Sequence, residues 1–253
     1  MIPEEELKTN PWAMEKIKVD SYNEEEGSMK GVDCPLCKNK GMIAVWHDGA
    51  PMSFKECECM NKRRSLLRIE ASGLSNLLEN YTMDKYLALT HEQYVAKNKA
   101  LEFSDSPRGW FFIAGRPGTG KTHLCTAICG KLIDKGFSVR YMLWREEAPR
   151  LKASINERSV YDKQMDELCN CDVLYIDDFW KGTVSEADIN LSFELLNSRY
   201  NDRRKVTIIS SEKTVEGILD IDEAIGSRIY ERCRGFCVQA PPDNFRLQAS
   251  GKD

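Results

Sequence analysis

The sequence lacks three features that would have indicated a membrane protein, a secreted protein or a generally basic one. No apolar run approaches the roughly 20 residues needed to span a bilayer. The acidic N-terminus MIPEEELKTN has no positive-then-apolar order typical of a signal peptide, so we expect a cytoplasmic protein with no membrane partner. The formal net charge of −4 excludes a surface coated in positive charge, so any contact with nucleic acid must come from a local patch.

The length of 253 residues suits one full α/β domain and a smaller appendage. In a cytoplasmic protein, the ten cysteines are expected to be reduced, buried or bound to metal rather than paired in disulfides. Composition shifts divide the chain into an acidic leader at 1–30, a cysteine-rich module at 31–60, a helical linker at 61–79 and a large domain at 80–253.

The large domain alternates apolar strands with helices. The predicted strands are Trp110–Ala114, Ser138–Trp144, Asp172–Asp177, Val206–Ser211 and Phe236–Ala240. The predicted helices are Thr122–Lys135, Glu146–Glu157, Tyr161–Leu168, Glu186–Arg203 and Asp222–Arg232. Near-continuous apolar strands in this order predict a five-stranded parallel sheet covered on both faces, with ligands at the carboxyl ends of the strands.

The stretch FFIAGRPGTGKTHL joins the first predicted strand to the first predicted helix through a glycine-rich turn. Such a turn lets backbone N–H groups wrap a polyphosphate, while Lys121 reaches the terminal phosphates and the Thr122 hydroxyl faces Mg²⁺. The positive end of the following helix points at the same phosphates. The predicted nucleotide contacts are Gly115, Arg116, Pro117, Gly118, Thr119, Gly120, Lys121, Thr122 and His123.

The stretch DVLYIDDF is an apolar strand that ends in two adjacent aspartates. Because side chains alternate along a strand, the two carboxylates are expected to diverge. We expect Asp177 to hold the Mg²⁺ shared with Thr122, and Asp178 to face the water that attacks the terminal phosphate. Together with the phosphate loop, this pair predicts an ATP-hydrolysing enzyme.

Two further segments carry candidate catalytic side chains. VTIISSE is an apolar strand ending in Ser210 and Ser211, and we assign Ser211 as the hydroxyl that senses the terminal phosphate, although either serine fits. AIGSRIYERC places Arg228 and Arg232 four residues apart on one helix face. After a complete ATP site, such an arginine can reach the phosphate of a neighbouring subunit and stabilise its transition state.

The cysteine-rich module contains CPLCKNKG and, nineteen residues after Cys37, the triplet CEC. Two thiolate pairs, Cys34 with Cys37 and Cys57 with Cys59, predict a closed structural Zn²⁺ site. The segment has too few apolar residues for a core of its own, so metal binding would supply its stability. The basic run NKRRSLLR after it fits either a phosphate-backbone contact or a solvated helix start.

The segments GRPGTGKTHL, VLYIDDF, TIISS and GSRIYERC resemble, in this order and spacing, the AAA+ core of bacterial and phage helicase loaders of the DnaC/DnaI type. The resemblance covers about residues 80–240. It implies an ATP-dependent loader that self-associates in the ATP state and contacts single-stranded DNA. The cysteine segment resembles the zinc-binding part with which such loaders dock on the hexameric replicative helicase of the DnaB type.

The resemblance also implies two departures from other AAA+ proteins. Most of them continue past the fifth strand into a helical lid, but here only PPDNFRLQASGKD remains after Ala240, so the lid is absent or reduced. Many carry Asp-Glu where this chain has Asp177-Asp178, and the shorter second carboxylate predicts slow hydrolysis, suited to a switch. Three alternatives stay open: an IstB-like transposition helper, a P-loop kinase of small molecules, and a zinc-ribbon DNA-binding protein with a vestigial ATP site.

Overall fold

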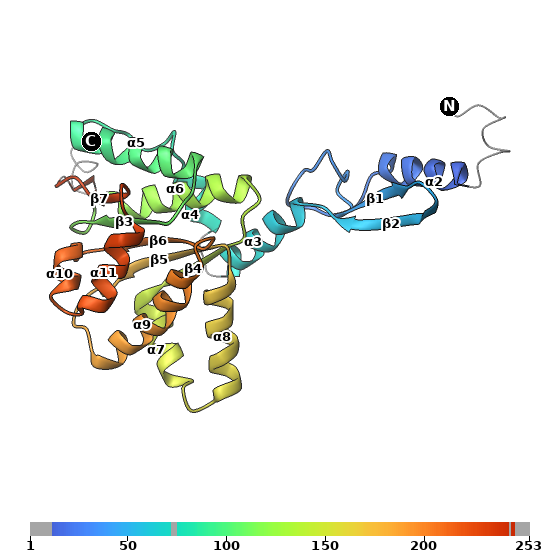
Figure 1. The fold of residues 1–253 in the computed structure, drawn as a ribbon. Coiled ribbons are helices and arrows are strands. Elements are labelled where there is room, and N and C mark those ends of the chain that lie inside the picture. The colour runs from blue at the N-terminus through green and yellow to red at the C-terminus, as the bar shows by residue number, and fades with distance from the viewer. Residues whose placement is uncertain (1–11, 72–74, 243, 246–253) are drawn as a thin grey trace. The chain divides into compact units, whose positions relative to one another are not determined.

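Figure 1 shows the computed structural model, which describes residues 12–71, 75–242 and 244–245. The chain divides into two compact units, Met1–Arg64 and Ser65–Asp253. The helix α3 (Cys59–Ala71) runs across this division. In the described part of the chain, no helix has both the length and the apolar character needed to cross a membrane.

The first unit is a helix packed on a β-hairpin. Its elements are α2 (Ala13–Glu24), β1 (Met42–His47) and β2 (Ala50–Glu56), followed by the start of α3. The two strands pair antiparallel, and Gly49 takes the positive φ of 77° that a tight hairpin turn requires. Asn23 fixes α2 to the hairpin by two hydrogen bonds with the main chain of Ala44, at 2.9 and 3.0 Å. The segment predicted to be a separate leader therefore contributes a helix to this unit.

The second unit is built on a five-stranded parallel sheet, as predicted. Its strands are β3 (Trp110–Ala114), β4 (Val139–Leu143), β5 (Val173–Phe179), β6 (Val206–Ser211) and β7 (Cys237–Gln239). They lie in the order β4-β5-β6-β3-β7, and every pairing is parallel. Because β6 lies between β3 and β5, Ser211 pairs with Ala114 on one side and with Phe179 on the other. The carboxyl ends of β3, β5 and β6 therefore meet at one edge.

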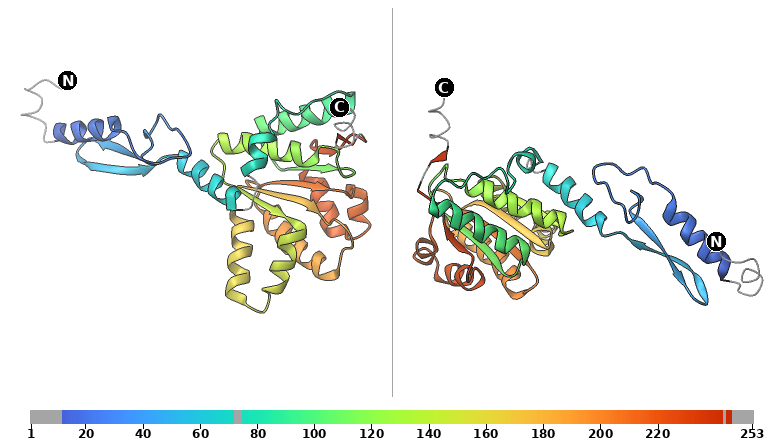
Figure 2. Two further views of the ribbon diagram at one scale, coloured as in Figure 1. Left: turned by 180° about the vertical axis from the view of Figure 1, so that it is seen from behind. Right: turned by 90° about the horizontal axis from the view of Figure 1, so that it is seen from above.

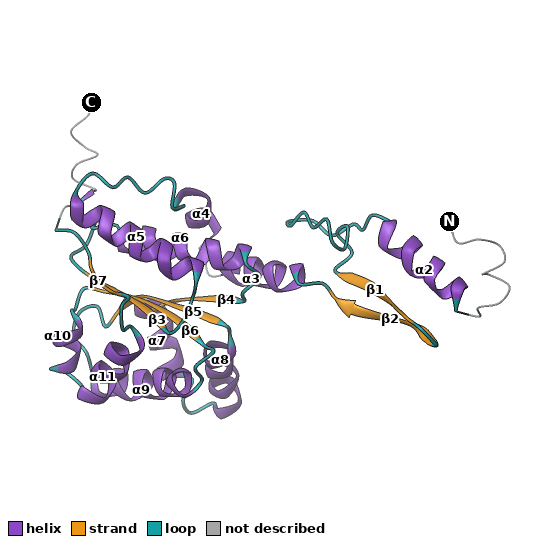
Figure 3. Cartoon of the chain, turned by 45° about the horizontal axis from the view of Figure 1, so that its top comes forward, coloured by secondary structure: helices purple, strands orange, loops and turns teal. Residues whose placement is uncertain are grey.

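Helices cover both faces of this sheet (Figures 2 and 3). The helices α4 (Ser75–Asn80), α5 (His91–Asp105) and α6 (Lys121–Asp134) pack on one face. The helices α7 (Trp144–Ala153), α8 (Arg158–Asn170), α9 (Glu186–Asn201), α10 (Val215–Leu219) and α11 (Glu223–Arg232) pack on the other. The alternation within β3 explains this arrangement, since Phe111 and Ile113 join one core cluster while Trp110 and Phe112 join the other.

The helices α5 and α10 were not predicted, and α3 and α4 differ from the sequence-based expectation. The region before β3 contains α5, which was not predicted and which begins with a capping box between Thr90 and Gln93. The helix predicted at Met60–Glu79 corresponds to α3 and α4, and residues 72–74 between them lie outside the described part of the chain. Weak apolar periodicity explains the first difference, because α5 buries mainly small or polar side chains.

Arg199, near the end of α9, is fully buried and ties helices to the sheet. Its guanidinium donates hydrogen bonds to the carbonyl oxygens of Leu168, Cys171 and Val206, at 2.9, 3.0 and 2.5 Å, and its Nε donates to the Thr207 hydroxyl at 3.0 Å. Burial lowers the pKa of Arg199, although the neighbouring thiols and Asp172 oppose this effect. The Arg199 side chain therefore provides hydrogen-bond donors for carbonyl oxygens at the ends of several helices and strands.

We expect Arg199→Met to lower the free energy of unfolding by about 3 kcal/mol, because it leaves several buried carbonyl oxygens without donors. Urea denaturation followed by circular dichroism measures this loss. The matched control is Arg204→Met, since Arg204 is exposed and its loss should cost no more than about 0.5 kcal/mol. Equal losses in the two variants would contradict the structural role of Arg199.

Candidate functional site

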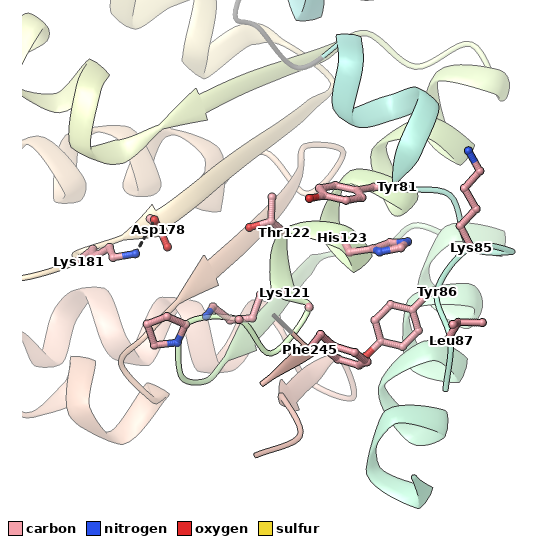
Figure 4. A pocket seen from close by; sticks show the side chains of 13 residues that line it. Tyr81, Lys85, Tyr86, Leu87, Lys121, Thr122, His123, Asp178, Lys181 and Phe245 are labelled. Carbon is pink, nitrogen blue, oxygen red and sulfur yellow. Dashed lines mark hydrogen bonds and ion pairs between the residues drawn. The ribbon is translucent and has the colours of Figure 1, made fainter. Parts of the chain in front are cut away.

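The predicted phosphate loop lies in the expected context, between β3 and α6. Gly118 and Gly120 have φ values of 82° and 81°, a backbone conformation that is energetically unfavourable for residues with a side chain. Gly120 is also the N-cap of α6. Gly115 is required for a different reason, since a Cβ atom there would lie 2.6 Å from the Cβ of Ala240. The loop therefore presents its backbone and the start of α6 to the pocket drawn in Figure 4.

Lys121 begins α6 and points back over the loop. Its Nζ donates to the carbonyl oxygens of Gly115 and Arg116, at 2.7 and 2.9 Å. Burial lowers the pKa of Lys121, while the carboxylates of Asp178 and Glu212 raise it. The ammonium group is thus held at the phosphate end of the pocket among groups that keep it charged.

Thr122 and Asp177 face one another across the junction of α6 and β5. The Thr122 hydroxyl oxygen lies 3.4 Å from each carboxylate oxygen of Asp177. Asp177 is buried and accepts hydrogen bonds from the hydroxyl of Tyr141, at 3.2 Å, and from the hydroxyl of Ser210. A threonine hydroxyl beside an oriented carboxylate is a donor set that fits Mg²⁺, which takes one or two carboxylates and completes its shell with phosphate and water.

Asp178 has a backbone conformation that directs its carboxylate away from Asp177. Its φ of 55° lies in the left-handed region, which costs a non-glycine residue on the order of 1–3 kcal/mol and is common at functional sites. Its N–H donates to the Ser210 hydroxyl at 3.0 Å. Figure 4 shows its carboxylate beside Lys181, whose Nζ donates to it at 3.0 Å. Lys181 is also 2.9 Å from the carboxylate of Glu212.

Lys181 and Glu212 were not predicted as site residues. Lys181 lines the pocket together with Lys121 and Asp178. The sequence contains a weak signal for Lys181, because this lysine lies three residues after Asp178. Glu212 follows β6 and becomes a neighbour only because β6 pairs with β5.

The structure favours Ser210 over the predicted Ser211 as the site hydroxyl. Ser210 contacts both aspartates, as described above. The Ser211 hydroxyl instead donates to the carbonyl oxygen of Phe179 at 2.8 Å and accepts the N–H of Lys213 at 3.0 Å. The alternation of side chains along β6 separates the two serines, and the sequence could not say which face carries the acidic pair.

The two candidate arginines of α11 also differ. Arg232 is buried and donates to the carbonyl oxygens of Tyr200 and Lys205, at 3.3 and 3.0 Å, so it has a structural role in place of the predicted catalytic one. Arg228 is only half-buried, donates to the side chain of Asn197 at 3.2 Å, and lies 4.8 Å from the ring centre of Phe193. Arg228 is therefore the one that remains a candidate for contacting a neighbouring subunit.

The pocket continues from the phosphate loop into a region of aromatic side chains. It has a volume of about 290 Å³, at the lower end for ligand pockets. His123 stacks on Tyr81, with ring centres 4.7 Å apart, and its Nε2 lies 2.9 Å from the carbonyl oxygen of Thr82. The other lining residues outside the loop and the charged cluster are Lys85, Tyr86, Leu87 and Phe245. Of this group only His123 was predicted.

The four predicted cysteine ligands of the first unit come together. The sulfur atoms of Cys34, Cys37, Cys57 and Cys59 all lie within 4.8 Å of one another. The Cys34–Cys57 and Cys37–Cys59 sulfur distances are 3.7 and 3.6 Å. A tetrahedral zinc ion with Zn–S bonds of about 2.3 Å separates its sulfurs by about 3.8 Å, so the cluster fits such an ion.

The backbone around the cluster also suits a metal. Lys38 and Asn39 have positive φ values, and the turn that they form brings the Gly41 N–H to 3.3 Å from the Cys37 sulfur. Although burial opposes ionisation, this N–H and the neighbouring thiols lower the pKa of Cys37 to about 6, whereas burial raises the pKa of Cys57 to about 12. Burial thus favours the thiol form of Cys57, and a bound cation would be needed to hold all four cysteines as thiolates. His47, in β1, lies 2.7 Å from the Ser53 hydroxyl and is not in the cluster.

Two residues of the basic run after the cluster serve the first unit itself. Arg63 is buried and donates to the carbonyl oxygens of Lys30 and Val32. Arg64 makes a two-bond ion pair with Glu56, at 2.7 and 2.8 Å. The structure therefore weakens the interpretation of this run as a phosphate-backbone contact.

Comparisons with known proteins agree with this geometry. A family described as "IstB-like ATP binding protein" matches residues 55–252. The phage-like element PBSX protein XkdC of Bacillus subtilis (strain 168) is 30% identical over 230 residues, which cover 84% of each chain. The replicative helicase loader DnaC of Escherichia coli (strain K12) is 25% identical over 206 residues, covering 79% of this chain and 81% of DnaC. A crystal structure of the DnaC helicase loader has a TM-score of 0.56 at 22% identity, covering 66% of this chain and 98% of that one.

We expect Lys121→Ala to weaken ATP binding by about 100-fold or more, because it removes a partly buried charge that faces the phosphates. Titration of a fluorescent ATP analogue measures the affinity, and a thermal melt checks that the fold is retained. Lys131→Ala, on the same helix but away from the loop, is the control and should bind ATP normally. Unchanged affinity in Lys121→Ala would contradict the assignment of the phosphate loop.

Proposed function

Since the chain belongs to the family of IstB-like ATP-binding proteins, we propose that it is an ATP-hydrolysing loader of a replicative DNA helicase. One observation carries the proposal. The phosphate loop, the Thr122–Asp177 pair and Asp178 share one edge of the sheet, while a separate unit presents a four-cysteine cluster. The similarity to the loader DnaC, at 25% identity over most of both chains, supports the helicase as the partner.

In this proposal the residues of the second unit divide the work of ATP hydrolysis. The loop N–H groups and Lys121 hold the phosphates, and Thr122 and Asp177 hold the Mg²⁺. When bound, Mg²⁺ neutralises charge that develops on the phosphate oxygens. Asp178 orients the attacking water and accepts its proton.

The contacts of Asp178 explain why hydrolysis should be slow. Its carboxylate is paired with Lys181 at 3.0 Å, so it must leave this ion pair before it can orient a water. Lys181 has a second carboxylate within reach, that of Glu212 at 2.9 Å, so it can release Asp178 without losing an ion-pair partner. A carboxylate that must first be released suits a switch that hydrolyses once per loading event.

Self-association would complete the site. Arg228 is half-buried at the surface of α11. Its guanidinium donates to the Asn197 side chain and the Ala224 carbonyl oxygen, and it lies over the rings of Phe193 and Tyr200. We propose that it leaves these contacts to reach the terminal phosphate bound by the next subunit in the ATP state. Such a charge supplied in trans stabilises the loose transition state of phosphoryl transfer.

The first unit is proposed to bind zinc and to dock on the helicase. Its cluster distances fit Zn²⁺, and its exposed Leu36, beside Cys37, and Phe54, on the hairpin, offer apolar contacts to a protein partner. Single-stranded DNA remains a proposed second partner of the ATP-bound second unit, as the resemblance to loaders implies. The family match keeps an IstB-like transposition helper as the competing function, with the transposase as its partner in place of the helicase.

We expect Asp178→Asn to retain ATP and Mg²⁺ but to lower turnover by about 100-fold, because an amide cannot accept the proton of the attacking water. Phosphate release under single-turnover conditions measures the effect. Asp220→Asn serves as the control, because Asp220 is exposed and lies outside the pocket. If turnover survives in Asp178→Asn, another group activates the water.

We expect the double variant Cys57→Ser, Cys59→Ser to lose zinc and helicase binding while ATP binding persists. The first unit has only a small apolar cluster around its cysteines, so metal ligation supplies most of its stability, whereas the second unit has two large apolar clusters. Atomic absorption, co-purification with the replicative helicase of the host and ATP titration measure the three properties.

The control for the double variant is Cys237→Ser, which changes an exposed cysteine of the second unit and should leave all three properties unchanged. Helicase binding by the zinc-free variant would move the docking surface to the second unit. If the wild-type protein binds a transposase and no helicase, the competing function is correct.

A further inference from the structure

Asn244 and Phe245, which follow the last strand, lie against the phosphate loop. The Ala240 N–H donates to the carbonyl oxygen of Ala114 at 2.6 Å, and the Phe245 N–H donates to that of Gly118 at 2.9 Å. The Asn244 side chain covers Gly118 so closely that a Cβ atom there would lie 2.1 Å from its carboxamide oxygen. Asn244 and Phe245, which follow β7, therefore lie against the phosphate loop, and Phe245 lines the pocket.

Phe245 and Tyr86 enter the pocket from two distant parts of the sequence. Their rings meet edge to face, with centres 5.8 Å apart. Both approach Gly120, since a Cβ atom there would lie 3.0 Å from the Tyr86 ring and 3.2 Å from the Phe245 ring. Figure 4 shows the two rings beside the loop, with Leu87 next to them and with His123 and Tyr81 farther along the same wall.

The Tyr86 hydroxyl is a buried polar group that the protein leaves unsatisfied. The residue is only 2% exposed, and within the described part of the chain its hydroxyl has no hydrogen-bond partner. Burial raises the pKa of Tyr86 to about 12, so the hydroxyl stays protonated and can donate a hydrogen bond. A buried hydroxyl without a partner is unfavourable, and one in a pocket wall is a ready contact for a ligand.

We propose that Phe245 and Tyr86 form the base-binding wall of the pocket, so that the purine ring of ATP packs on the Phe245 ring. The proposal rests on ATP binding at the phosphate loop. The purine stacks on the Phe245 ring, and a ring nitrogen of the base accepts a hydrogen bond from the Tyr86 hydroxyl after a small shift of the Phe245 ring. Because Phe245 is hydrogen-bonded to Gly118, occupation of the base site is coupled to the shape of the loop.

Inorganic triphosphate separates the base contact from the phosphate contact. We expect Phe245→Ala to raise the Kd for Mg·ATP by about tenfold and to leave the Kd for inorganic triphosphate within about twofold, since stacking on one aromatic ring is lost while the loop contacts remain. Phe245→Trp should restore ATP affinity and report binding by a change in its fluorescence. Phe54→Ala, an exposed aromatic residue of the first unit, should bind both ligands as the wild type does.

Three outcomes would overturn the proposal. Unchanged ATP affinity in Phe245→Ala would mean that the base does not contact this ring, and tighter binding would mean that Phe245 occupies the site and must leave it. Equal losses for ATP and triphosphate would mean that the segment acts only on the loop. A wild-type protein that binds neither ligand would instead refute ATP binding itself, which distinguishes that failure from the failure of the base contact.

Discussion

The placement of β6 between β3 and β5 is the constraint on which the site depends. It brings the end of β3, where the phosphate loop begins, to the same edge as the aspartates that end β5. Ser210, on the strand between them, holds both aspartates through one hydroxyl. Parallel strands carry their carboxyl ends at one edge, so this strand order brings the loop and both aspartates together although β3 and β5 are far apart in the sequence.

Charge balance at this edge governs what the site can do. Lys121 and Lys181 share the pocket with Asp178, and Asp177 lies just behind them. Lys181 pairs with both Asp178 and Glu212, so this edge carries a network of opposite charges beside the phosphate loop. The Asp178 carboxylate pairs with Lys181, whereas the Asp177 carboxylate faces Thr122, so the two aspartates have different partners.

The two units differ in how much apolar surface they bury. The second unit buries two large apolar clusters on the two faces of its sheet. The first unit has a helix on a two-stranded hairpin and a cluster of cysteines, and too little apolar surface to fold by burial alone.

The sequence alone determined the five strands, the phosphate loop, the aspartate pair and the four cysteines, because each depends on local pattern or on fixed spacing. It did not reveal α5, whose buried face is made mainly of small and polar residues. Only the tertiary structure decided between Ser210 and Ser211, and between Arg228 and Arg232, since the choice depends on which side of a strand or helix faces the site. It also decided that Phe245 lies on the phosphate loop beside Tyr86, because contacts between residues far apart in the chain are set by packing and leave no periodic signal in the sequence.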